Sequence, residues 1–76
     1  MDVNELLEYA IKESNNIASN EFFLIKDLFK GYEWNRIPKK DRLLLGTLFL
    51  NYVKKEQSHI VPFEKTASGQ QKYKYI

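Results

Sequence analysis

IVPFEKTASGQQKYKYI, residues 60–76, contains two strand-like runs with a turn between them. The runs cover 60–66 and 71–76, and the intervening residues 67–70 include a glycine, as is typical of longer hairpin loops. Pro62 has no N–H to donate to a neighbouring strand, so the first run is predicted to lie at the edge of a sheet. The stretch therefore predicts a β-hairpin.

The second run of this hairpin also predicts which side chains are exposed. Side chains alternate along a strand, so Tyr73 and Tyr75 share one face while Lys72 and Lys74 share the other. The alternation favours the tyrosines as sheet core and the lysines as exposed residues. The lysines are therefore the stronger candidates for contact with a partner, and Tyr73 is a further candidate that would stack on an unpaired base.

A long helix is predicted over about 39–56, directly before the hairpin. Pro38 suits the first turn of such a helix, and Gly46 costs about 1 kcal/mol relative to alanine in its interior. We therefore expect another backbone to approach closely at Gly46. Leu43 and Leu50 lie off the main apolar stripe and predict a second surface that covers part of the helix. The core face is predicted to consist of Leu45, Leu48, Phe49, Tyr52 and Val53, and the opposite face of Lys40, Thr47, Asn51 and Lys54.

The N-terminal half predicts three further elements. A helix is expected over about 2–15, a short strand over 21–25, and a short helix that starts at 26–30 and is interrupted by Gly31. Trp34 and Ile37 are expected to follow it in a loop or last turn. The order helix, strand, helix, helix, strand, strand predicts a single α+β domain over 1–76, a small winged helix (winged helix-turn-helix) whose last two strands form the wing.

Charge is distributed unevenly along the chain. Residues 1–38 hold four basic and seven acidic side chains, a balance of −3, whereas residues 39–76 hold eight basic and three acidic ones, a balance of +5. Such asymmetry is expected of a face that binds a polyanion, and also of a merely solvated face. A phosphate could bind where basic residues open the helix at 39; the alternatives are that they are solvated, or that Arg42 pairs with Asp27 or Glu33. The candidate nucleic-acid-binding residues are Lys39, Lys40, Arg42, Lys54, Lys65, Lys72, Lys74 and Tyr73.

Several function classes are disfavoured by the residues present. The chain has no cysteine and a single histidine, His59, so neither a zinc site nor another metal site is expected, and no cofactor is expected either. No nucleophile–base pair can be proposed, which predicts a protein that is not an enzyme. No export signal and no membrane span are visible, so the expected location is the cytoplasm.

One string of residues is distinctive. It consists of Asp27-Leu28-Phe29-Lys30-Gly31-Tyr32-Glu33-Trp34, Ile37-Pro38, Arg42-Leu43-Leu44-Leu45-Gly46, Phe49, Lys65-Thr66 and Tyr73. Over about 22–76 the chain resembles a family of very short Gram-positive proteins that is catalogued as a domain of unknown function. Family members from mobile cassette chromosomes, encoded near a replicative helicase, look like winged-helix proteins that bind single-stranded DNA. The resemblance implies that fold and that function, and it implies no particular binding residues.

Three functions follow as hypotheses. The first is a single-stranded DNA-binding accessory protein for replication of a mobile genetic element, with a helicase or polymerase as a further partner. The second is a duplex-binding regulator, which the scarcity of arginine on the long helix disfavours. The third is an adaptor that binds protein alone, through Leu43 and Leu50. Under the first hypothesis, removing Lys65, Lys72 and Lys74 should weaken binding, whereas removing Lys12 and Lys26 should change little.

Overall fold

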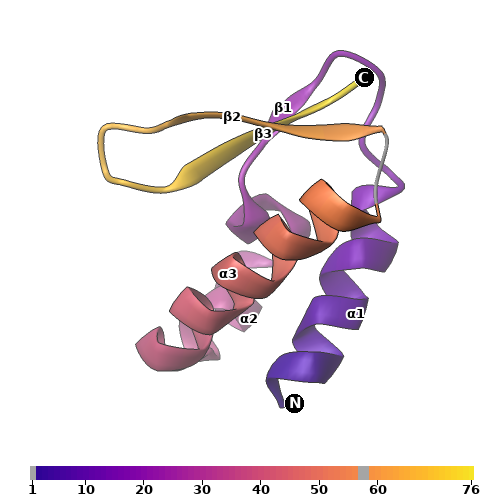
Figure 1. The fold of residues 1–76 in the computed structure, drawn as a ribbon. Helices are drawn as coiled ribbons and strands as arrows, with labels where there is room; N and C mark the ends of the chain where they lie inside the picture. The colour runs from indigo at the N-terminus through magenta and orange to yellow at the C-terminus, as the bar shows by residue number, and fades with distance from the viewer. Residues whose placement is uncertain (1, 57–58) are drawn as a thin grey trace.

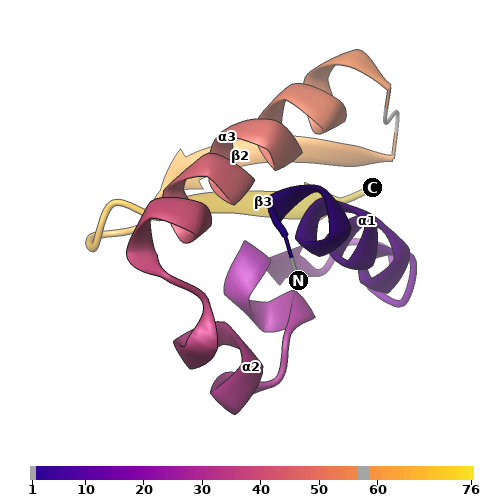
Figure 2. The same ribbon diagram turned by 90° about the horizontal axis from the view of Figure 1, so that it is seen from below.

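The computed structural model describes residues 2–56 and 59–76. Within them the chain forms α-helices and one antiparallel sheet of three strands in the order β1-β3-β2. The helices pack on one face of this sheet, and the β2–β3 turn projects beside the N-terminal half of α3 (Figures 1 and 2). The elements are α1 (Val3–Ser14), β1 (Phe22–Phe23), the 3-10 helix η1 (Ile25–Leu28), α2 (Gly31–Arg36), α3 (Lys39–Lys55), β2 (Ile60–Lys65) and β3 (Gln71–Tyr75).

Acidic side chains start the elements of the N-terminal half. At α1 the Asp2 carboxylate accepts the Glu5 N–H at 2.9 Å, and the Glu5 carboxylate accepts the Asp2 N–H at 3.4 Å. The same spacing recurs at η1, where Asp27 accepts the Leu24 N–H at 2.9 Å. These carboxylates satisfy donors that a helix start leaves without a partner. Some of the carboxylates of the N-terminal half therefore cap nearby helix starts.

The expectation that Gly31 interrupts a helix was wrong, because Gly31 begins α2 and Trp34 lies inside it. The Glu33 carboxylate accepts the Lys30 N–H at 3.1 Å, which starts a new helix directly after the 3-10 turn. The predicted strand at 21–25 is present but has only two residues, Phe22–Phe23.

The core lies between the sheet and the helices. The predicted face of α3 is confirmed at Leu45, Phe49 and Val53, which are buried. The Phe49 ring meets the Tyr73 ring edge to face, with centroids 5.1 Å apart. The expectation that another backbone approaches Gly46 closely was wrong. A Cβ built at that position would meet nothing within 4 Å.

The predicted C-terminal hairpin is confirmed. β2 lies at the edge of the sheet, as Pro62 indicated, and its pairing with β3 shifts register between Pro62 and Lys65. The turn closes through the Gly69 N–H, which donates to the Thr66 carbonyl at 2.9 Å. Gly69 has φ +85°, a conformation in which a side chain would be strained.

Candidate nucleic-acid interface

A groove separates the N-terminal half of α3 from the β2–β3 turn. Its volume is about 480 Å³, and residues of η1 and α2 also line it. Among the described residues that line it, four are cationic, namely Lys26, Lys39, Arg42 and Lys65, and none is acidic. We call this the α3–hairpin groove; its other lining residues are Leu24, Ile25, Trp34, Leu43, Gly46, Leu50, Ser68, Gly69, Gln70 and Gln71.

The groove brings together cations that are far apart in the sequence. It contains three of the predicted site residues, Lys39, Arg42 and Lys65, and it adds Lys26. Removal of Lys26 was expected to change binding little, but the structure places Lys26 in the groove beside the predicted site residues. Because β1 pairs with β3, the η1 segment that follows β1 lies close to the hairpin. Lys12, in contrast, is exposed on α1 and does not line the groove.

Arg42 is held by backbone groups and an aromatic ring. Its Nε donates to the Ile37 carbonyl at 2.8 Å and its Nη2 donates to the Asn35 carbonyl at 3.4 Å. Its guanidinium also lies over the Trp34 ring, with Cζ 5.6 Å from the centroid. These contacts satisfy carbonyls at the end of α2 and tie α2 to α3. Neither an ion pair with Asp27 nor one with Glu33 is seen; Arg42 contributes charge to the groove from a fixed position.

Trp34 forms part of the wall of the groove. It is half-buried, and besides Arg42 it contacts the Phe29 ring at a centroid distance of 5.8 Å. An indole held by these two neighbours packs as part of the fold, as a lone tryptophan in a small domain usually does. Tyr32, on the same helix, is instead 54% exposed.

A second cationic surface lies on the face of the sheet away from the helices. Lys72 and Lys74 point there from β3, and Phe22 and Phe63 come from the strands on either side. We call these four residues the outer sheet face. The ammonium groups of Lys72 and Lys74 lie 4.8 Å and 5.4 Å from the centroid of the Phe22 ring. The predicted opposition of lysines and Tyr73 on β3 is confirmed by this arrangement.

The remaining predicted residues lie elsewhere. Tyr73 has no exposed surface, so it cannot stack on a base, and the structure removes it from the candidate contacts. Its ring faces the helices because alternation places it opposite the lysines. Burial raises the pKa of its hydroxyl to about 12. Lys40 and Lys54 are exposed on α3, as predicted, but line neither the α3–hairpin groove nor the outer sheet face.

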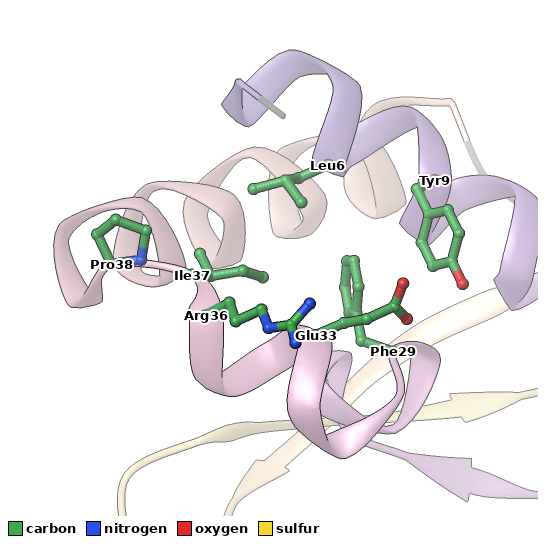
Figure 3. Close-up of a pocket in the computed structure, with 7 residues that line it drawn as sticks. All are labelled: Leu6, Tyr9, Phe29, Glu33, Arg36, Ile37 and Pro38. Carbon is green, nitrogen blue, oxygen red and sulfur yellow. The ribbon is translucent and has the colours of Figure 1, made fainter.

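A smaller pocket of about 310 Å³ lies between α1 and α2 (Figure 3). Its walls are mainly apolar, with Leu6 and Tyr9 from α1 and Ile37 after α2. Partial burial and the nearby charge of Glu33 raise the pKa of Tyr9. Glu33 and Arg36 place opposite charges on this pocket, so it suits a polyanion less well than the groove does.

The described residues include neither a metal-binding cluster nor a helix that could span a membrane. Across 2–56 and 59–76, no three His, Cys, Asp or Glu side chains gather in a way that could hold a metal ion. His59 instead stacks on Tyr75, with ring centroids 6.1 Å apart. The helices in the same ranges include none that is both long and apolar enough to cross a bilayer.

The fold and its surfaces define a small α+β domain with a basic groove and a basic sheet face. The chain belongs to the family described as Domain of unknown function (DUF1413), whose model matches residues 8–74. No curated protein and no solved structure matches the chain. The match confirms that the sequence resemblance was to a domain of unknown function, and it also includes the second half of α1, from residue 8.

Proposed function

We propose that this chain is a small winged-helix protein that binds single-stranded DNA and has no catalytic activity. The order α1-β1-α2-α3-β2-β3 and the sheet order β1-β3-β2 support the winged-helix assignment, with the β2–β3 hairpin as the wing. The observation that carries the binding proposal is the α3–hairpin groove, in which four cations gather without a carboxylate. A phosphate backbone is the polyanion that such a surface suits.

The side chains favour a single strand over a duplex. Sequence readout in the major groove relies chiefly on arginine, which bonds guanine through two donors at once. The only arginine on α3 is Arg42, and its Nε and Nη2 already donate to backbone carbonyls. The residue next to Arg42 is apolar instead, since Leu43 is 66% exposed and offers no hydrogen bond to a base. Lysines that act as point charges suit a flexible strand read without sequence preference.

Fluorescence anisotropy with a labelled single strand and the matching duplex, each at two salt concentrations, tests the proposal. Lys39→Ala with Lys65→Ala removes two charges from the groove, and Lys12→Ala with Lys55→Ala removes two exposed charges outside it. Each phosphate contact adds about 0.7 to the log–log salt slope, so the groove variant should lose about 1.4 in slope. Its affinity should fall about 25-fold at about 0.1 M salt. The control variant should lose far less.

The possible results separate the three hypotheses. Tighter binding to duplex at equal salt would replace the proposal with a duplex-binding regulator. Absence of binding to both nucleic acids at low salt would favour a protein adaptor, for which the exposed Leu43 is the natural contact. Equal losses in the two variants would mean that the groove has no special role.

The biological setting of the proposal comes from the family resemblance noted in the sequence. By that resemblance, the protein would be an accessory factor in replication of a mobile genetic element, beside a helicase or polymerase, and we propose the cytoplasm as its location. Co-purification of the protein with a replicative helicase, compared with co-purification of the groove variant, would test whether such a partner binds independently of DNA.

A further inference from the structure

We propose that the outer sheet face is a second contact surface for the same single strand, where unpaired bases stack on Phe22 and Phe63. This inference rests on the proposed function, because it assigns a base-binding role to residues outside the α3–hairpin groove. The inference concerns Phe22 and Phe63, which were not among the candidate residues that the sequence indicated.

The two rings form an exposed aromatic pair. Phe22 is 46% exposed and Phe63 is 47% exposed, although both are large apolar side chains. Their centroids are 5.1 Å apart and their planes meet at 77°, so each ring supports the other edge to face. Phe22 comes from β1 and Phe63 from β2, and β3 runs between these strands. The three hydrogen-bonded strands therefore fix the position of the two rings, and the rings remain exposed on the sheet surface.

Charge indicates what this aromatic pair binds. Lys74 lies directly opposite Phe22 in the β1–β3 pairing, and the ammonium groups of Lys72 and Lys74 both lie over the Phe22 ring. A base can stack on an aromatic ring while its phosphates meet the adjacent cations, which is how sequence-tolerant single-strand surfaces work. Glu21 precedes Phe22, but its carboxylate accepts the Ala18 N–H at 2.6 Å and is thereby engaged in its own loop. The surface is therefore complementary to a polyanion with flat apolar groups, which is a single-stranded nucleic acid.

The hairpin connects the two surfaces. Gln71 lines the α3–hairpin groove, while the next residue, Lys72, lies on the outer sheet face. The Gln71 side-chain amide also donates to the Phe63 carbonyl, which fixes the groove side of β3 to the strand that carries Phe63. A strand that passes around the β2–β3 hairpin would meet the phosphate-binding groove and then the aromatic pair. A rigid duplex could not follow that path.

An oligonucleotide without bases provides the first test, with the unaltered protein. A thymidine oligonucleotide and an abasic one of equal length carry the same phosphates, so the groove should bind both equally. Stacking of one base contributes about 5- to 150-fold in affinity. We expect the thymidine strand to bind more tightly by at least the lower of these factors, with an equal salt slope for both strands.

Substitution of the aromatic pair provides the second test. Phe22→Leu with Phe63→Leu keeps the surface apolar but removes the rings, so the preference for thymidine over abasic strand should disappear while the salt slope stays the same. Tyr32→Leu is the matched control, because Tyr32 is 54% exposed and also has cations over its ring, Arg36 at 5.0 Å and Lys30 at 6.0 Å. This control should keep the preference. Thermal melting of each variant checks that it is folded.

The outcomes distinguish this inference from the proposed function. If the unaltered protein bound both strands equally, base stacking would be overturned and binding through phosphates would stand. If the preference for thymidine persisted in the Phe22 and Phe63 variant, the bases would stack elsewhere and the outer sheet face would be excluded. If no single strand bound at low salt, the proposed function itself would fail.

Discussion

Tyr73 carries a hydroxyl group that is buried without a hydrogen-bond partner among the described residues. The ring itself is well packed, stacked on Phe23 at a centroid distance of 5.6 Å and edge to face with Phe49 at 5.1 Å. On folding, the hydroxyl loses its bonds to water and gains none from the part of the chain that the structure describes. Replacement of Tyr73 by phenylalanine keeps the ring and removes the oxygen, and we expect the domain to become more stable.

The size of the gain can be worked out from two opposing contributions. An unsatisfied buried hydroxyl costs about 1–3 kcal/mol, and Tyr73→Phe removes that cost. The lost oxygen leaves a void of roughly 15 Å³, which at about 24 cal/mol per Å³ costs about 0.4 kcal/mol. The free energy of unfolding should therefore rise by about 0.6–2.6 kcal/mol. In a domain of this size each kcal/mol raises Tm by about 4–8 °C.

Thermal and urea unfolding of both proteins measures this difference, and pH provides a second readout. Burial raises the pKa of Tyr73 to about 12 from 10.0, so between these values the unfolded chain loses a proton that the folded chain keeps. The stability of the unaltered protein should therefore fall by up to about 1.4 kcal/mol per pH unit as pH rises from 10 to 12. The phenylalanine variant lacks this loss, so its advantage should grow over the same range.

Tyr32→Phe is the control for this prediction, because Tyr32 is exposed and its hydroxyl reaches water. It should change stability by less than about 0.5 kcal/mol. A Tyr73→Phe protein that unfolds more easily than the original would refute the reasoning, since it would mean that the buried hydroxyl makes a stabilising bond.

Two further predictions concern the groove and the glycines. Arg42→Lys keeps the charge but cannot reproduce both bonds to the Ile37 and Asn35 carbonyls, so stability should fall by about 1–2 kcal/mol while the salt slope of DNA binding is unchanged. Thermal melting and anisotropy would show this, and a variant as stable as the original would contradict the structural role of Arg42. Gly46→Ala should raise the free energy of unfolding by about 1 kcal/mol, because alanine is favoured over glycine inside a helix. The added Cβ would also meet nothing within 4 Å. Gly69→Ala should instead lower stability by about 1 kcal/mol, because φ is +85°; urea unfolding of the two alanine variants should give opposite signs, and equal signs would contradict the backbone argument.

Local sequence patterns were sufficient to predict α1 and the faces of β3. The helix predicted over about 2–15 is present as α1, which Asp2 and Glu5 cap, and the alternation around Tyr73 predicted the faces of β3. α2 was missed because Gly31 was interpreted as a break. The reach of the Glu33 carboxylate to the Lys30 N–H, the same three-residue spacing as in α1, is a signal that could have been found.

The candidate site depended on contacts that local patterns do not contain. Removal of Lys26, which lies in the acidic half of the sequence, was expected to change binding little, yet Lys26 lines the α3–hairpin groove together with Lys65. Their proximity follows from the pairing of β1 with β3, and strand order cannot be obtained from spacing along the chain. Phe22 illustrates the same point, since only its position opposite Lys74 shows that it belongs to a cationic face.

The two outer strands of the sheet have a consequence for how copies of the protein behave when crowded together. An open edge presents unpaired N–H and C=O groups that can recruit a strand from another chain, which leads to aggregation. Here β1 has only two residues, and β2 carries Pro62 and a register shift after it. Neither edge offers a straight run of pairing groups, so copies of the protein could lie close together without their sheets pairing into one.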